Sequence, residues 1–144
     1  MKFRKKILSV LLFWSFMVTS SQADWAAISA EELANDSALI VIGEMIEVKV
    51  AQAPEKDHKV SVGVIQIQEV LKGEYHSETL FLTMPYVGEG VVRSSSDVNF
   101  TTGQNGLWYL QAIGNNHYSA DRPDRFVKLD QAADQIQKLR CQKD

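Results

Sequence analysis

Two long segments with the alternating pattern of β-strands constrain this chain more than any other feature. Residues 38–51 begin with an apolar run and continue as alternating apolar and charged side chains, and residues 59–72 form a second segment of this kind. Gly43 lies inside the first segment and Gly63 inside the second, where the apolar positions also change parity. Because a glycine inside a strand marks a bulge or a sharp bend, the pattern predicts two long strands that coil around a small barrel.

Three shorter segments complete the predicted sheet. Residues 79–84, 106–113 and 117–120 are rich in β-forming side chains, and the last two flank a hairpin turn signal, Gly114-Asn115-Asn116. Residues 126–129 are a candidate for a short edge strand. Five strands, with two long ones first, predict an OB-fold, which is a five-stranded Greek-key barrel. The runner-up, an immunoglobulin-like sandwich, would need about seven strands.

Helical signals flank this predicted barrel on both sides. Ser29 and Glu32 form a capping box that predicts a helix over residues 30–35. Asp130 is the predicted N-cap of a second helix over residues 131–141, where apolar residues recur at helical spacing. The predicted fold is therefore mainly β: a five-stranded OB-like Greek-key barrel with a short N-terminal helix and a C-terminal helix.

The N-terminal segment has the three parts of a secretory signal peptide. A basic cluster at residues 2–6 precedes an apolar run, which is followed by the small residues Ser21 and Ala23. The apolar run is shorter than the ~20 residues that a transmembrane helix needs, although an uncleaved anchor is the alternative. We expect a cut between Ala23 and Asp24. Residues 24–144 then form a single domain that is exported, periplasmic or extracellular, with no stable membrane insertion after cleavage.

Charge and cysteine content narrow the expected partners. The whole chain carries 15 basic and 18 acidic side chains, and four of the basic ones lie in the leader, which gives the mature domain a net charge of −7. An acidic domain has no global attraction for phosphate backbones, so nucleic acid is not an expected partner. Cys141 is the single cysteine, so no internal disulfide is expected. This thiol is either half-buried and inert or free to link two chains into a dimer.

Three stretches of the predicted core carry a resemblance to a known family. They are residues 38–48, Glu69-Val70-Leu71-Lys72-Gly73 and Gly106-Leu107-Trp108-Tyr109-Leu110. Together they resemble small secreted bacterial OB-fold domains of the tissue-inhibitor-of-metalloproteinase (netrin-like) type, over roughly residues 28–130. The resemblance implies fold and not activity, because inhibitors of this type use a free N-terminal cysteine to chelate a protease zinc. Here the predicted mature N-terminus is Asp24-Trp25.

No arrangement of side chains in the sequence requires a chemical reaction. His58, His76 and His117 lack the spacing of metal ligands. No serine lies in a nucleophile-elbow motif, and the acidic pair Glu31-Glu32 is accounted for by helix capping. The charged run at residues 121–125 is interpreted as a salt-bridged turn. We therefore expect no catalytic residue, no cofactor and no metal, and a protein that is not an enzyme.

A long segment at residues 85–105 is the first candidate for partner binding. It combines an aromatic residue, Tyr86, with the apolar Val91 and the basic Arg93, separated by glycines. Recognition loops often have this mixture of side chains. The alternative is a strand-like flap that covers one end of the barrel.

Aromatic residues on adjacent predicted strands are the second candidate. Trp108 and Tyr118 are selected because OB-folds bind oligomeric ligands across a strand face with aromatic side chains. The alternative is core packing, because strand alternation places Trp108 and its neighbour Tyr109 on opposite faces, and one of the two must be core.

The sequence leaves three functions open. The expected one is a non-enzymatic exported binding module that presents the 85–105 loop and nearby aromatics to an exported protein or glycan. An inhibitor-like domain acting on an exported hydrolase is an alternative that rests on the resemblance alone. A small hydrolase with an unrecognised site is another, and it would require a pocket that encloses two carboxylates with shifted titration.

Overall fold

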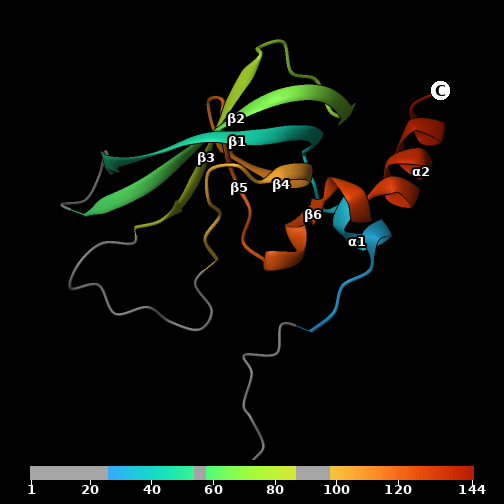
Figure 1. Cartoon of the computed structure of the whole chain (residues 1–144), viewed down its shortest axis with the longest axis horizontal. Helices are drawn as coiled ribbons and strands as arrows, with labels where there is room; N and C mark the ends of the chain where they lie inside the picture. The colour runs from blue at the N-terminus through green and yellow to red at the C-terminus, as the bar shows by residue number, and fades with distance from the viewer. Residues whose placement is uncertain (1–25, 54–57, 87–97) are drawn as a thin grey trace, which may run out of the picture.

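The protein is mainly β, with one six-stranded mixed sheet and two α-helices (Figure 1). The structure, a computed structural model, describes residues 26–53, 58–86 and 98–144. The predicted signal peptide, residues 1–23, lies outside the described residues. Within this described part, no helix is long and apolar enough to cross a membrane.

The strands pair in a circuit that gives the sheet a ring-like form. The six strands are β1 (Leu39–Gln52), β2 (Lys59–Lys72), β3 (Thr79–Pro85), β4 (Asn105–Gly114), β5 (His117–Ser119) and β6 (Phe126–Lys128). The pairs β1–β2, β2–β3, β4–β5 and β1–β4 are antiparallel, and β3–β5 is parallel. Strand β6 pairs antiparallel with β4, outside this circuit. All five predicted strand positions are therefore confirmed, with small differences at their ends.

One apolar cluster fills the inside of the ring. Trp108 and Leu110 of β4 meet buried residues of β1, β2 and β3 there. The rings of Phe100 and Phe126 pack against Trp108 with centroid distances of 5.1 and 4.4 Å. The indole N–H of Trp108 donates to the carbonyl of Gly43 at 2.9 Å, so its polar atom is satisfied inside the core.

A second apolar cluster covers the other face of β1 and β4. Helices α1 (Ala30–Asn35) and α2 (Ala133–Lys143) lie side by side there (Figure 1). The helices contribute Leu33, Ile136 and Leu139, and the strands contribute Ile40, Ile42, Leu107 and Tyr109. Residues 39–42 and 107–110 are consequently buried on both faces of the sheet.

Both predicted helices are present, but the second begins differently. Helix α1 begins at the predicted capping box: the hydroxyl of Ser29 accepts from the Glu32 N–H, and the Glu32 carboxylate accepts from the Ser29 N–H, both at 3.1 Å. The prediction that Asp130 caps helix α2 is wrong, because Asp130 lies in a short 3₁₀ helix (Leu129–Gln131) that precedes it. The N-cap is Ala132, which is fully buried, so packing determines where this helix begins.

The apolar pattern of β2 predicts that its inward face changes near Gly63, and this prediction is wrong. Ser61, Gly63 and Ile65 are all buried, whereas the valines between them are half-buried on the opposite face. The space above Gly63 is occupied by Met45, since a Cβ added at Gly63 would lie 2.5 Å from the Met45 sulfur. Gly63 thus admits a neighbouring side chain. The bulge predicted at Gly43 is confirmed by a shift of register at that residue.

The candidate edge strand at residues 126–129 is confirmed as β6, which makes the sheet six-stranded and not five-stranded. The backbone of β6 lies so close to Gly106 of β4 that a Cβ there would clash with the carbonyl of Val127. The predicted salt-bridged turn comes just before β6 and is confirmed. Its Arg125 is 1% exposed and forms ion pairs with Asp121 of the same turn and with Asp36 at the end of α1.

Candidate functional site

The predicted recognition loop is only partly within the described residues. Tyr86 is half-buried at the end of β3, with the ammonium of Lys59 at 5.7 Å from its ring centroid. It lines a surface hollow together with His58 and Thr83. Val91 and Arg93 lie outside the described residues, so their role in partner binding stays a prediction.

Trp108 cannot meet a partner in this structure. Its side chain has no exposed area and lies within the inner cluster. One of Trp108 and Tyr109 was expected to be a core residue, and both are. The helices bury Tyr109 on the face of the sheet opposite to Trp108. The Tyr109 hydroxyl donates to the side-chain oxygen of Gln135 at 2.6 Å, and burial raises the pKa of Tyr109 to about 12. Trp108 thus packs inside the ring, and Tyr109 joins the sheet to the helices.

Tyr118 is part of a packed aromatic pair. Its ring meets that of Tyr75 edge-to-face at 5.9 Å, and it is half-buried against the inner cluster. The Tyr75 hydroxyl donates to the Thr79 carbonyl at 2.7 Å, and burial raises the pKa of Tyr75. Trp108 is enclosed in the inner cluster, Tyr118 packs on Tyr75, and Tyr86 follows the end of β3, so the three do not form one exposed binding platform.

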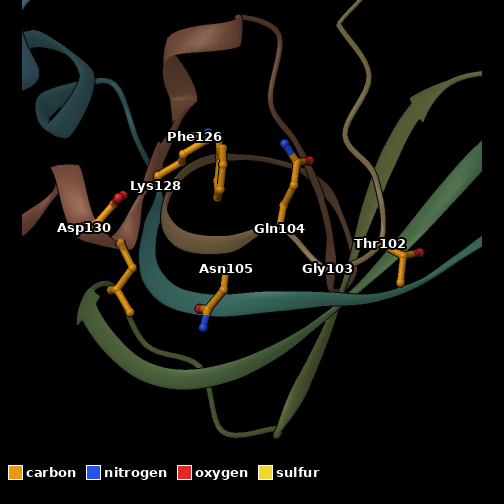
Figure 2. Close-up of a pocket in the computed structure, with 8 residues that line it drawn as sticks. Thr102, Gly103, Gln104, Asn105, Phe126, Lys128 and Asp130 are labelled. Atoms are coloured by element: carbon orange, nitrogen blue, oxygen red, sulfur yellow. The ribbon is translucent and has the colours of Figure 1, made fainter.

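A different place on the surface combines an opening with several polar groups. An open hollow of about 670 Å³ lies between the turn that precedes β4 and the segment around β6. Figure 2 shows the side chains of both segments around this opening. The residues that line it are Thr102, Gly103, Gln104, Asn105, Phe126, Lys128, Leu129 and Asp130. The volume falls within the range of small-ligand sites, about 300–1,000 Å³.

The turn that forms one wall is anchored by backbone hydrogen bonds to β1. The Gly103 N–H donates to the carbonyl of Met45 at 2.7 Å, and the Met45 N–H donates to the carbonyl of Gln104 at 2.9 Å. The side-chain oxygen of Gln104 accepts from the Thr101 N–H at 2.7 Å. Gly103 has φ of +94°, a conformation that favours glycine. This wall is therefore held in place before any ligand arrives.

Asn105 supplies an unsatisfied acceptor at the hollow. Its side-chain oxygen is buried and has no hydrogen-bond partner among the described residues. The opposite wall is Phe126, whose ring packs against Trp108 and whose position is thus fixed by the core. Lys128 and Asp130 are exposed and add a cation and a carboxylate. The hollow offers one aromatic surface with both donors and acceptors around it.

Sequence reasoning reached one wall of this hollow and missed the other. Thr102 and Asn105 belong to the predicted 85–105 loop, but Phe126 and Lys128 were interpreted only as an edge strand. The two walls meet because β6 pairs with β4, with Gly106 opposite Lys128. A glycine at the start of β4 was the one local signal that another backbone approaches there.

Other reactive side chains lie apart from the hollow. His117 stacks on Phe81 at 5.6 Å, and within the described ranges no group of three or more His, Cys, Asp or Glu side chains could hold a metal ion. Cys141 is exposed, so the interpretation of a half-buried thiol is wrong.

Comparison with models of known protein families and with curated protein sequences found no match.

Proposed function

We propose that the protein is an exported, non-enzymatic binding module built on an OB-like Greek-key barrel. The pairing circuit β1-β2-β3-β5-β4-β1 supports the barrel, because five strands joined in this way leave the inner cluster enclosed. The basic, apolar and small-residue parts of residues 1–23 support export. The likeness to netrin-like domains is a proposal about fold only, because one fold hosts many functions.

The observation that carries the binding proposal is the unpartnered oxygen of Asn105 beside the hollow. A buried acceptor without a donor costs about 1–3 kcal/mol. This oxygen has almost no accessible area, so a ligand hydroxyl or amide would donate to it only after the Asn105 side chain turns toward the hollow, and that bond would then remove the cost. The 102–105 wall belongs to the segment predicted to recognise a partner.

A glycan fits the side chains of the hollow better than a protein surface does. Sugar hydroxyls can donate to Asn105 or to the carboxylate of Asp130 and can accept from the ammonium of Lys128, while the apolar side of the sugar ring packs on Phe126. The centres of protein interfaces are depleted in lysine and aspartate. Oligosaccharides are, in addition, a known class of ligand for barrels of this type.

Binding to a panel of immobilised oligosaccharides tests this proposal. The variants Lys128→Ala and Asp130→Asn change exposed side chains of the hollow, so the fold should be retained. Each should weaken binding of a captured glycan by about tenfold, since hydrogen bonds to charged groups contribute about 1.5–3 kcal/mol. Lys138→Ala and Asp134→Asn, which change exposed residues of α2, are the matched controls and should bind as the wild type does.

Two results would contradict the proposal. If no oligosaccharide of the panel binds, the glycan assignment fails. If a glycan binds and the hollow variants retain the wild-type affinity, the hollow is not the site.

A further inference from the structure

One stretch of β1 has an edge with no strand partner in the described part of the chain. Strand β4 pairs with β1 only from Leu39 to Glu44, and the adjoining turn adds the two backbone bonds at Met45. Ile46 lies at a shift of register between β1 and β2, and from Glu47 to Val50 β1 pairs with β2 on one side and with no other strand among the described residues. An edge of this kind presents free backbone donors and acceptors to another strand.

The side chains of this edge are more apolar than an exposed edge usually allows. Ile46, Val48 and Val50 are 42%, 38% and 57% exposed. Exposed edge strands are normally protected by charges, proline or a covering element. Here the two charged residues, Glu47 and Lys49, form an ion pair with each other at 3.1 Å within the strand.

The order of these residues is complementary to itself. If two copies of the strand run antiparallel about a two-fold axis at Val48, each Glu47 lies opposite the Lys49 of the other copy. In the same register Ile46 lies opposite Val50, and Val48 lies opposite Val48. Every directly opposed pair is therefore either oppositely charged or apolar, and such cross-strand pairs are favourable.

We propose that Ile46–Val50 is a self-association edge, which joins two copies of this chain into a continuous antiparallel sheet centred on Val48. The occupant is a second copy because an unrelated strand would have to supply the same order of charge and apolar side chains, which this edge already contains. A two-fold contact uses the same patch on both copies and closes on itself, so it gives a dimer and not a filament. None of these five residues lines the glycan hollow, so the inference is independent of the proposed function.

Charge reversal tests the register directly. Sedimentation of the purified protein at increasing concentration should show a reversible monomer–dimer equilibrium. Lys49→Glu and Glu47→Lys each place like charges opposite one another twice per dimer, and each should raise the dissociation constant about tenfold or more. The double variant Glu47→Lys/Lys49→Glu restores opposite charges in both pairs and should return the dissociation constant to near the wild-type value.

Three controls isolate the edge. Glu47 and Lys49 are exposed, and circular dichroism should show an unchanged fold in all variants. Lys138→Glu changes the net charge by the same amount as Lys49→Glu, from an exposed position on α2, and should leave the equilibrium unchanged. All measurements use a Cys141→Ser background, because the exposed thiol could otherwise link two chains.

Three outcomes would overturn the inference. The first is a wild type that is monomeric at every concentration. The second is a dimer that Lys49→Glu does not weaken, or that Lys138→Glu weakens equally. The third is a double variant that stays as weak as the single ones. The proposed register is supported if the double variant, and neither single variant, has a dissociation constant near that of the wild type.

Discussion

The two halves of β1 differ in how many neighbouring strands and side chains cover them. Leu39–Met45 pairs with β2 on one side and with β4 or the adjoining turn on the other, and both faces are covered by apolar clusters. Ile46–Val50 has one strand partner among the described residues, and all its residues are exposed. The same strand is thus a central core element at one end and an exposed edge at the other. The first half of β1 therefore contributes to the stability of the fold, and the second half is available for surface interactions.

The largest loss of stability is expected when a residue that packs against the covered half of β1 is replaced. Trp108→Ala removes a fully buried ring and its hydrogen bond to Gly43, and should lower the free energy of unfolding by about 3–5 kcal/mol. Val50→Ala, in the exposed half, should change it by less than about 0.5 kcal/mol. Urea unfolding measures both. Similar losses for the two variants would contradict the division of β1.

A second prediction concerns the buried charge that holds α1 to the segment before β6. Arg125 is surrounded by Asp36, Asp121 and the hydroxyl of Ser37, while both carboxylates are more than half exposed. Replacing both carboxylates, Asp36→Asn with Asp121→Asn, leaves a buried cation without compensation and should cost about 3 kcal/mol. Urea unfolding should show this loss.

The matched changes should cost less. Arg125→Ala leaves carboxylates that water can reach, so its loss should be smaller than that of the double aspartate variant. Asp124→Asn, whose carboxylate is 36% exposed and pairs with Arg122 in the same turn, should cost less than about 1 kcal/mol. A loss for Arg125→Ala that exceeds the loss for the double variant would contradict this assignment.

Much of the strand pattern could be predicted because it depends on local signals. The bounds of β2, the helix at Ala30–Asn35 and its capping box all follow from alternation, turn residues and short-range hydrogen bonds. The face of β2 that points inward could not be predicted, because Gly63 has no apolar side chain and the core is filled there by Met45 from β1. A pattern of side chains in one strand does not reveal what a neighbouring strand contributes.

The candidate site was harder to predict than the fold for the same reason. The hollow requires the turn that ends at Asn105 to lie beside the segment that begins at Phe126, and the pairing of β4 with β6 brings these two segments together. Trp108 was selected as a binding aromatic because OB-folds bind oligomeric ligands across a strand face, but residues 107–110 of this strand are covered on both faces. Helices that are distant in sequence bury this strand, and the sequence of the strand itself contains no signal that predicts it.

A third, smaller prediction concerns the surface contact between α2 and β2. Arg140 donates two hydrogen bonds to the carboxylate of Glu69, at 3.1 and 2.6 Å, and mainly these bonds lower the pKa of Glu69 below its usual value. A lowered pKa in the folded state stabilises the protein above the unfolded pKa of the group. That stability is lost as the pH falls through the folded pKa.

Glu69→Gln is therefore expected to cost at most about 1 kcal/mol near neutral pH, because both side chains are more than one-third exposed. The difference from the wild type should shrink as the solution becomes acidic. Urea unfolding at a series of pH values measures it, with Glu78→Gln, an exposed carboxylate just before β3, as the control. A difference that grows toward acidic pH would contradict the assigned direction.

Native-state hydrogen exchange along β1 tests the division of this strand most directly. Amides of Ile40–Ile42 should exchange only through global unfolding, because both edges and both faces of the strand are covered. Amides of Ile46–Val50 that do not bond to β2 should exchange through local opening, many times faster. Equal protection along the whole of β1, at protein concentrations where the chain is monomeric, would contradict the division into a core half and an edge half.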